Sequence, residues 1–316
     1  MSAGPSLDDI RVAARRIAPF IHRTPVLTCS ALDAMAGARL YFKCENLQKT
    51  GSFKIRGATN AILQLSPAEA ARGVVTQSSG NHAAAVSRAA SARGIAAHIV
   101  MPKNAPTVKC RAVEGYGGVI TFCEPTVESR DAATKRLLEE TGGVLVHPYN
   151  DRRVIAGQGT AALELLEDVP ELDVLLVPVS GGGLLSGNAI AATSLRPSVR
   201  VIGCEPANAD DAFRSLKSGH IEKNTTTDTI ADGLRAQLCD LTFSILRERV
   251  DEIVRVTEQE IVDAMRLVWE RMKIVIEPSS AVALAPAMAH SIKADGKRVG
   301  VLLSGGNVEL SALPFH

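Results

Sequence analysis

The chain has 316 residues, of which 46% are hydrophobic and 22% are charged, and its formal net charge is +1. A chain of this length exceeds the size at which one hydrophobic core usually keeps growing, so two domains are expected. The near balance of charges argues against nucleic acid or an anionic membrane as a partner and leaves small molecules as the expected ligands.

The N-terminal segment predicts an amphipathic helix rather than a targeting signal. Ser6 with Asp9 three residues later is typical of a helix start, and apolar residues follow near helical spacing. The segment lacks the apolar stretch of a secretory signal, and no apolar run in the sequence approaches membrane-spanning length. Six scattered cysteines without a CxxC pair suit a reducing compartment. We therefore expect a cytoplasmic protein.

Short β-branched runs alternate with alanine-rich helical patterns through most of the chain. Continuous apolar strands separated by helices predict parallel sheets that are covered on both faces, and so an α/β fold. A second helix start, Thr257 with Glu260, opens a helical pattern nearer the C-terminal end. The predicted strands are residues 73–77, 97–101, 118–122, 174–179, 201–204 and 299–303.

Three segments that directly follow predicted strands are rich in glycine and small polar residues: 78–82, 180–184 and 304–307. Ligands of α/β folds bind outside the carboxyl ends of the strands, which is where these segments are expected. The glycine triplet in 180–184 lets backbone amides approach an anion such as phosphate, with the positive end of a helix dipole behind them. Tight turns and helix caps explain the same residues without a ligand. The absence of GxGxxG and GxxxxGK[ST] from this loop argues against a dinucleotide or nucleoside triphosphate.

Lys54 is a candidate catalytic residue because apolar residues and two glycines, rather than other charges, surround it in the sequence. A partly buried lysine has a lowered pKa and can form a Schiff base with an aldehyde cofactor. An ordinary surface lysine is the alternative that the spacing leaves open.

Seven motifs occur together and in order: SFKIRGATN (52–60), SSGNHAAA (78–85), VIAGQGT (154–160), VSGGGLL (179–185), EPANADD (205–211), TIADG (229–233) and LSGGNVEL (303–310). Together they resemble the serine racemase and serine/threonine dehydratase family. The resemblance runs from about residue 24 to residue 310 and implies the fold type II architecture of pyridoxal 5'-phosphate enzymes. That architecture has two domains, each with a mostly parallel sheet flanked by helices, and implies a large domain of residues 1–71 and 151–316 with residues 72–150 inserted as a small domain.

The resemblance implies a role for each cofactor-binding residue. Lys54 holds pyridoxal phosphate as a Schiff base and removes the Cα proton of the substrate, while Ser79 is the acid or base on the opposite face. Ser304 faces the pyridine nitrogen, and because its hydroxyl is neutral the ring is a weaker electron sink, which suits prompt elimination. The other implied cofactor ligands are Phe53 beside the ring, Asn81 at the phenolic oxygen, and the backbone amides of Ser180, Gly181, Gly182, Gly183 and Leu184 at the phosphate.

The same resemblance implies that the substrate carboxylate binds to a set of residues at the start of one helix. Arg130 matches an arginine at the mouth of the small domain and could bind a second carboxylate in two parallel hydrogen bonds, which makes 3-hydroxyaspartate a candidate substrate. A surface arginine is the alternative, and His82 is expected to serve the start of the helix rather than to carry protons. The implied carboxylate-binding residues are Ser78, Ser79, Asn81 and His82.

A divalent cation is also implied, with Glu205, Asp211 and the backbone carbonyl of Ala209 as ligands. Oxygen ligands of this kind suit Mg²⁺, Mn²⁺ or Ca²⁺ better than zinc. A plain acidic loop is the alternative, and Asp210 is expected to point away from the cation.

Five positions depart from the pattern of the animal serine racemases. Tyr149 resembles the aromatic residue of threonine dehydratases, and together with Ala236 it weakens a pure racemase interpretation. Changes at Cys29 and Ala84 touch the nucleotide site of the animal racemases. In the phosphate loop, Ser180 stands where those proteins have a glycine.

The sequence therefore predicts a homodimeric dehydratase that acts on L-serine, L-threonine or L-3-hydroxyaspartate and releases a 2-oxo acid and ammonia. The alternative is a serine or aspartate-type racemase that uses Lys54 and Ser79 as two opposed bases. A non-catalytic ligand-binding protein and a nicotinamide dehydrogenase are two further hypotheses. The intact Lys54, Ser79 and Ser304 argue against the former, and the missing GxGxxG motif argues against the latter.

Overall fold

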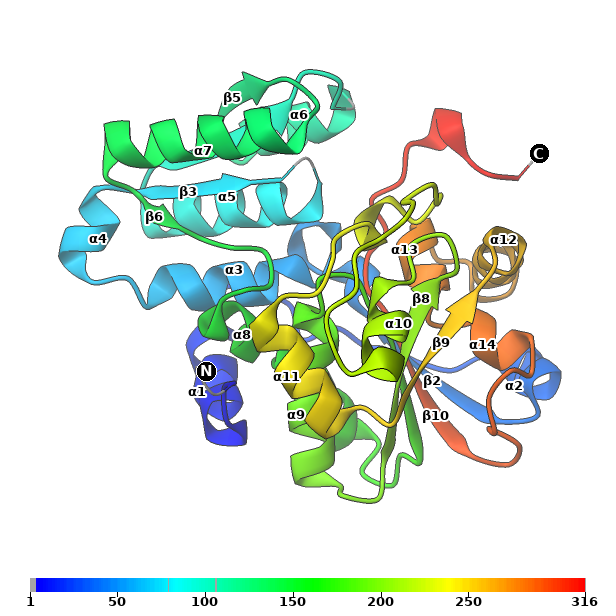
Figure 1. Ribbon diagram of the computed structural model, residues 1–316. Coiled ribbons are helices and arrows are strands. Elements are labelled where there is room, and N and C mark those ends of the chain that lie inside the picture. The colour runs from blue at the N-terminus through cyan, green and yellow to red at the C-terminus, as the bar shows by residue number, and fades with distance from the viewer. Residues whose placement is uncertain (1–3, 79, 106, 316) are drawn as a thin grey trace.

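The computed structural model describes residues 4–78, 80–105 and 107–315, and it contains two separate β-sheets (Figure 1). The large sheet has the strand order β1-β2-β10-β7-β8-β9 and is parallel except where β1 pairs antiparallel with β2. The small sheet has the order β5-β4-β3-β6 and is entirely parallel. This confirms the predicted α/β fold. The strands are β1 Val26–Leu27, β2 Arg39–Cys44, β3 Val74–Gln77, β4 Ala97–Pro102, β5 Val119–Cys123, β6 Val144–Leu145, β7 Val174–Pro178, β8 Arg200–Pro206, β9 Glu252–Val256 and β10 Arg298–Leu303.

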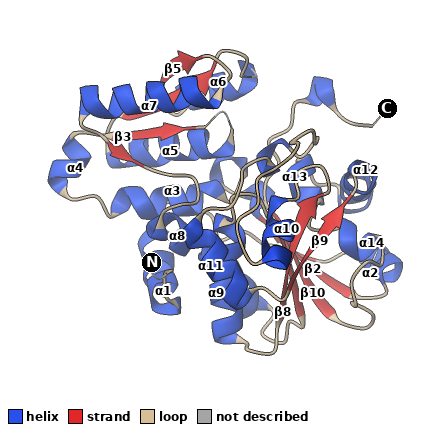
Figure 2. Ribbon diagram, in the orientation of Figure 1, coloured by secondary structure: helices blue, strands red, loops and turns tan. Residues whose placement is uncertain are grey.

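Helices surround both sheets (Figure 2). Among the described residues, no helix is both long and apolar enough to cross a lipid bilayer. The helices are α1 Leu7–Ile17, α2 Ser30–Ala36, α3 Lys54–Leu63, α4 Pro67–Ala71, α5 Asn81–Arg93, α6 Thr107–Gly115, α7 Val127–Thr141, α8 Arg152–Asp168, α9 Gly183–Leu195, α10 Asp211–Ser218, α11 Asp240–Arg249, α12 Glu258–Leu267, α13 Pro278–Ala281 and α14 Ala285–Met288.

Side chains along each strand alternate between two apolar layers, as the pleat of a strand requires. In the small sheet Val74 packs with α5 on one face, while Val75 packs with α7 on the other. In the large sheet Leu175 packs with α8 and α9, while Leu176 packs with α12 and α14. Because both faces are covered, apolar residues occupy consecutive positions in these strands, which is the pattern that made them recognisable in the sequence.

All six predicted strands are present, with ends that differ from the predictions by at most two residues. Both predicted helix starts are also confirmed. Ser6 accepts a hydrogen bond from the amide of Asp9 and caps α1, and Thr257 accepts one from Glu260 and caps α12. In each case the acidic side chain reaches back to the amide of the capping residue.

The strands of the small sheet lie between residues 74 and 145, and β2 and β7 of the large sheet flank them in sequence. The apolar core on one face of the small sheet also takes in Ile55, Ile62 and Val154, which lie outside the predicted insertion. The predicted domain boundaries at residues 72 and 150 stay a prediction.

Helix α8 lies between α3 and α9, and glycines allow close contact between the three backbones. A Cβ atom on Gly157 would lie 2.6 Å from the carbonyl oxygen of Arg56 in α3. One on Gly187 in α9 would lie 2.3 Å from the carbonyl oxygen of Ile155 in α8. Since these neighbours are backbone atoms, no side-chain rotation relieves the overlap. Helix α8 therefore sets the spacing between α3, which begins at Lys54, and α9, which begins in the glycine-rich loop.

We expect Gly187→Ala to lower the free energy of unfolding by about 3 kcal/mol, because the new methyl group overpacks a backbone contact. Urea-induced unfolding measures this loss. The matched control is Gly115→Ala at the end of α6, where a Cβ atom would meet nothing within 4 Å. This control should leave stability unchanged or raise it by up to about 1 kcal/mol. Equal losses in both variants would contradict the close crossing of α8 and α9.

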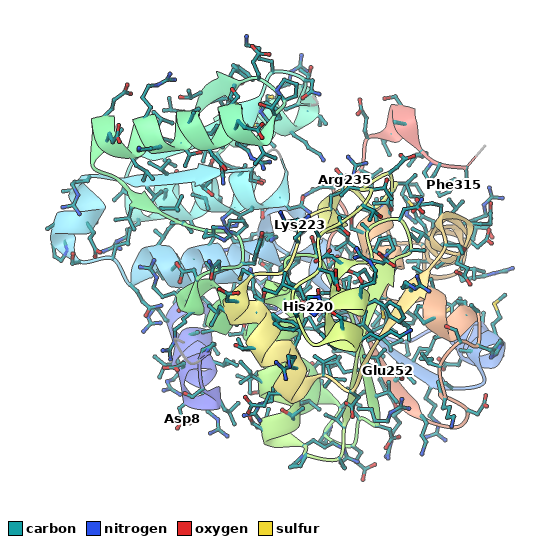
Figure 3. All side chains as sticks on the ribbon, viewed as in Figure 1. Asp8, His220, Lys223, Arg235, Glu252 and Phe315 are labelled. Atoms are coloured by element: carbon teal, nitrogen blue, oxygen red, sulfur yellow. The ribbon has the colours of Figure 1, made fainter. Side chains whose placement is uncertain are left out.

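The C-terminal segment after β10 is held in place by aromatic packing. Phe315, labelled in Figure 3, meets Trp269 edge-on with 5.4 Å between the ring centroids. The guanidinium of Arg266 also lies over the ring of Phe315, 5.4 Å from its centroid. Arg266 belongs to α12, and Trp269 belongs to the π-helical turn that follows it. The chain end is therefore fixed against helices that cover the large sheet.

Candidate active site

Three segments of the large sheet converge at the carboxyl ends of its parallel strands. The chain leaves β2 toward Lys54, leaves β7 into the glycine-rich loop of residues 179–182, and leaves β10 at Ser304. Segment 78–82, at the carboxyl end of β3 in the small sheet, faces the same region because Asn81 hydrogen-bonds to Glu277 and Asn307. The structure therefore brings together the segments that the sequence predicted to form one site.

The glycine-rich loop can only be made from small residues. A Cβ atom on Gly181 would lie 2.5 Å from the ring of Tyr149, and one on Gly183 would lie 2.7 Å from the Cβ of Tyr149. Gly182 has a backbone φ of 83°, which residues with a side chain rarely adopt. Helix α9 starts directly at the end of this loop, so its free amides and positive dipole end point toward it. Leu184, in the first turn, buries its side chain in the core.

Lys54 occupies the first position of α3 and is half-buried. Its Nζ donates a hydrogen bond of 3.3 Å to the carbonyl oxygen of Pro148, the neighbour of Tyr149, so the lysine lies close to the glycine-rich loop. Burial lowers the pKa of Lys54 to about 8, and the charge of Glu277 partly opposes this effect. The Nζ also lies 5.1 Å from the ring centroid of Phe53.

Ser304 lies next to Lys54 in space. The backbone amide of Phe53 donates to the carbonyl oxygen of Ser304 at 3.0 Å, and Ser52 pairs with Gly305 in an isolated bridge. The Ser304 side chain is 2% exposed, and its Oγ is 3.2 Å from the Oγ of Ser280. A neutral hydroxyl therefore stands where a carboxylate would have raised the basicity of any ring nitrogen bound beside it.

A buried ion network holds the first turn of α3 in position, through a residue two positions after Lys54. The guanidinium of Arg56 is fully buried and bonds to Glu45 at 2.7 Å and to Glu164 at 2.8 Å. Lys43 bonds to the same Glu164 at 2.6 Å. Two cations and two carboxylates balance, and removing one partner would leave an uncompensated buried charge. The network thus fixes the helix that presents Lys54.

Two histidines near Lys54 are neutral. Burial, and then the charge of Lys54, lower the pKa of His82 to about 3 and that of His147 to about 4. His82 Nε2 lies 3.0 Å from the carbonyl oxygen of Val146, so Nε2 carries the proton. His147 Nδ1 accepts hydrogen bonds from the amides of Tyr149 and Asn150. His82 is therefore fixed at the start of α5, as expected, and His147 was not identified from the sequence.

The predicted carboxylate-binding residues lie around the start of α5. Ser78 Oγ accepts from the amide of Gly80 at 3.3 Å, and Asn81 is the first residue of the helix. Ser79 lies outside the described residues, so its predicted role as an acid or base stays a prediction.

Arg130 lies in the first turn of α7, and its Nε is buried without a hydrogen-bond partner among the described residues. Its charge lowers the pKa of Tyr149, although burial raises that pKa overall. Since Tyr149 contacts the glycine-rich loop, Arg130 lies on the side of the small sheet that faces the site. A half-buried guanidinium whose Nε donor is unused is suited to binding a carboxylate.

The predicted cation ligands Glu205, near the end of β8, and Asp211, the first residue of α10, are both buried. Burial and then the charge of Asp211 raise the pKa of Glu205 well above its ordinary value, and burial raises that of Asp211 to about 6. Asp210 instead forms ion pairs with two arginines, Arg214 and Arg255. No cluster of three His, Cys, Asp or Glu side chains that could hold a metal occurs within the described ranges. The possible oxygen ligands here are therefore the carboxylates of Glu205 and Asp211 and the backbone carbonyl of the buried Ala209.

The loop between α10 and α11, marked by Lys223 and Arg235 in Figure 3, is tied to both candidate sites. Ser180 Oγ accepts from the amide of Ala236 at 3.0 Å. Two residues later the amide of Leu238 donates to Asp211 at 3.0 Å. The side chain of Ser180 thus orders this loop, which a glycine at the same position would not do.

Glu277 is the main residue that the sequence did not predict. It is 4% exposed, and Asn81 Nδ2 donates to its two carboxylate oxygens at 2.9 and 3.1 Å. Burial raises the pKa of Glu277 to about 7. The available signal was a single acidic residue directly after the apolar run 274–276, where a surface charge is not expected.

The chain resembles known proteins along nearly its whole length. The family model described as pyridoxal-phosphate dependent enzyme matches residues 17–305. A serine racemase of Dictyostelium discoideum is 53% identical over 98% of this chain and 96% of its own length. A beta-hydroxyaspartate dehydratase of Paracoccus denitrificans is 50% identical over 99% of each chain. The solved structure of maize serine racemase has a TM-score of 0.96 and 50% identity, over 98% of this chain and 95% of that one.

Proposed function

Because the chain belongs to the family of pyridoxal-phosphate dependent enzymes, we propose that it is a dehydratase that eliminates water from a β-hydroxy amino acid. The proposed substrates are L-3-hydroxyaspartate, L-serine and L-threonine, and the products are a 2-oxo acid and ammonia. The convergence of Lys54, the glycine-rich loop and Ser304 at one edge of the large sheet carries this proposal.

The residues present fit pyridoxal phosphate. Lys54 supplies an amine of lowered pKa that forms no ion pair among the described residues. The loop of Gly181, Gly182 and Gly183 offers backbone amides at the start of α9, where a phosphate would be stabilised. When bound, the cofactor supplies an aldehyde that captures the substrate amine and a ring that withdraws electrons from its Cα.

The protein's own groups have separate tasks in this proposal. Lys54, with a pKa of about 8, is partly unprotonated near neutral pH and removes the Cα proton. His82 and His147 are neutral, so they add no positive charge beside Lys54. With the cofactor bound, Ser304 would present its hydroxyl to the ring nitrogen. Phe53 would pack beside the ring, Asn81 would hold its phenolic oxygen, and Ser78 and His82 would help to hold the substrate carboxylate.

Racemisation is the second candidate function, because a 53% identical relative is a serine racemase. It requires a second acid or base on the face of Cα opposite Lys54, and Ser79 is the proposed residue. Tyr149 against the glycine-rich loop, in place of a small polar side chain, favours elimination over racemisation.

We propose that Glu205, Asp211 and the backbone carbonyl of Ala209 are the ligands of a divalent cation, Mg²⁺ or else Mn²⁺ or Ca²⁺. Two buried carboxylates with raised pKa values have the donor chemistry that such a cation stabilises. A homodimer and residence in the cytoplasm complete the proposal.

Mg²⁺ at about 100 times its dissociation constant is expected to add about 2.7 kcal/mol to the free energy of unfolding, and EDTA should reverse the gain. Differential scanning fluorimetry measures it as a rise in Tm. The rise should shrink as the pH falls through about 6, because protons then compete for Asp211. Asp211→Asn should abolish the rise and Asp210→Asn should retain it, since Asp210 pairs with Arg214 and Arg255 instead. A rise that survives Asp211→Asn would contradict the assigned ligands.

The proposed function is tested by measuring products from the purified protein with pyridoxal phosphate and Mg²⁺. L-serine, L-threonine and both diastereomers of L-3-hydroxyaspartate are supplied separately, and both 2-oxo acids and D-amino acids are quantified. Dominant 2-oxo acid from one substrate would support the dehydratase and identify its substrate. Dominant D-amino acid would replace it by the racemase.

A further inference from the structure

Glu277 is a fixed, buried carboxylate between the two parts of the molecule. Its backbone amide donates to the carbonyl oxygen of Gly305 at 3.0 Å, and a Cβ atom on Gly305 would lie 2.8 Å from its Oε1. It comes directly before α13, on the side of the large sheet. A carboxylate that is 4% exposed is costly to bury unless its partners compensate it.

The hydrogen-bond partner of Glu277 comes from the small sheet's side of the site. Asn81, the first residue of α5, donates through Nδ2 to both carboxylate oxygens. Its Oδ1 accepts from Asn307 Nδ2 at 2.8 Å, and the same Nδ2 donates to the carbonyl oxygen of Thr50 at 2.8 Å. Because a carboxylate only accepts hydrogen bonds and Asn307 donates, these contacts allow one orientation of the Asn81 amide. Its Nδ2 faces Glu277 and its Oδ1 faces Asn307.

Three charged groups face Glu277 from three other elements. Lys109 on α6 and Asp232, in the 3₁₀ turn 232–234, form an ion pair with each other. Both residues line a cavity of about 370 Å³, and Asn81 lines it too. At Glu277 they act in opposite directions: the charge of Asp232 raises its pKa, and the weaker effect of Lys109 lowers it. Lys54 on α3 is the third group, and no carboxylate among the described residues lies within ion-pair distance of it. Among the described residues, the charge that opposes the effect of burial on the pKa of Lys54 is that of Glu277.

We propose that Glu277 is a positioning residue of the active site. It holds the amide of Asn81 in one orientation across the two sheets, and its charge keeps Lys54 protonated to a higher pH than burial alone would allow. The inference rests on the proposed roles of Lys54 and Asn81. Since Glu277 has a pKa of about 7, most of its charge is present at about pH 8, where Lys54 is half protonated.

The test uses Glu277→Gln, which keeps a hydrogen-bond acceptor for Asn81 but removes the charge. In the full-length chain without cofactor, we expect the pKa of Lys54 to fall by about one pH unit. Labelling of Lys54 by acetic anhydride between about pH 6 and pH 10, read by peptide mass spectrometry, measures this pKa. Glu309→Gln is the control, because Glu309 lines the same cavity but is exposed.

Glu277→Ala separates the hydrogen bond from the charge. We expect the dissociation constant of Glu277→Ala for pyridoxal phosphate to rise roughly fivefold, because this variant loses the hydrogen bonds that orient Asn81. The dissociation constant of Glu277→Gln should change less than about twofold. Far-ultraviolet circular dichroism establishes that each variant is folded. A folded Glu277→Gln protein whose Lys54 titrates as in the unaltered protein would overturn the inference. A shifted Lys54 in a protein that makes no 2-oxo acid would instead leave the inference standing and remove the proposed function.

Discussion

Replacing Lys54 by alanine is expected to reduce 2-oxo acid release by roughly 10⁴-fold or more, because one residue both holds the cofactor and removes the Cα proton. The visible absorbance that bound pyridoxal phosphate gives to the purified protein should be lost or shifted in the same variant. Lys54→Arg should be equally inactive, since a guanidinium keeps the positive charge but cannot give up its proton. Steady-state assays and absorbance spectra measure both effects.

Lys135→Ala is a suitable control for that experiment. Lys135 lies on α7, its side chain is 80% exposed, and its one carboxylate partner, Glu139, lies 3.9 Å away along the same helix. Its removal should leave activity and spectrum unchanged. If Lys54→Ala kept more than about a hundredth of the turnover, a different residue would have to be the base.

Arg130→Ala should lower activity on L-3-hydroxyaspartate much more than activity on L-serine. We expect kcat/KM for L-3-hydroxyaspartate to fall by about 10²-fold, because a charge-assisted pair of hydrogen bonds to the second carboxylate is lost. Turnover of L-serine should change less than about threefold, since L-serine has no second carboxylate. Most of the loss should appear in KM if Arg130 binds the substrate and the transition state equally. Steady-state kinetics on both substrates measure the difference.

Arg136→Ala on the same helix is the matched control. Arg136 is 61% exposed and lies 3.7 Å from Glu140, so its guanidinium already has a surface partner. Arg130→Lys is informative too, because it keeps the charge but loses the parallel pair of hydrogen bonds. Equal loss for L-serine and L-3-hydroxyaspartate in Arg130→Ala would remove the assigned specificity.

The sequence predicted the six strands with a continuous apolar centre and missed four others: β1 and β6, which are only two residues long, and β2 and β9, which carry charged residues. Strand β2 was missed because Arg39 and Lys43 interrupt its apolar pattern. Lys43 is nonetheless fully buried, and it is compensated by Glu164, 121 residues later in the chain. A pairing over such a distance leaves no trace in local periodicity.

The same division holds for the candidate site. Lys54 and the glycine-rich loop became candidates through their immediate neighbours in sequence, and the resemblance carried by the seven motifs assigned their roles. Glu277 and His147 were not, because what makes them special is contact with Asn81 and with the amides of Tyr149 and Asn150. Residue type and spacing identify a group that reacts, whereas a group that tunes or holds another is visible only after folding.

The loop tied to Ser180 and Asp211 has a thermodynamic consequence. A phosphate held beside Ser180 and a cation held by Asp211 would each restrict the same short segment, through Ala236 and Leu238 respectively. Whichever ligand binds first bears the entropy cost of ordering that segment. By reciprocity the two affinities are then linked, and the factor by which the cation tightens the cofactor equals the factor by which the cofactor tightens the cation.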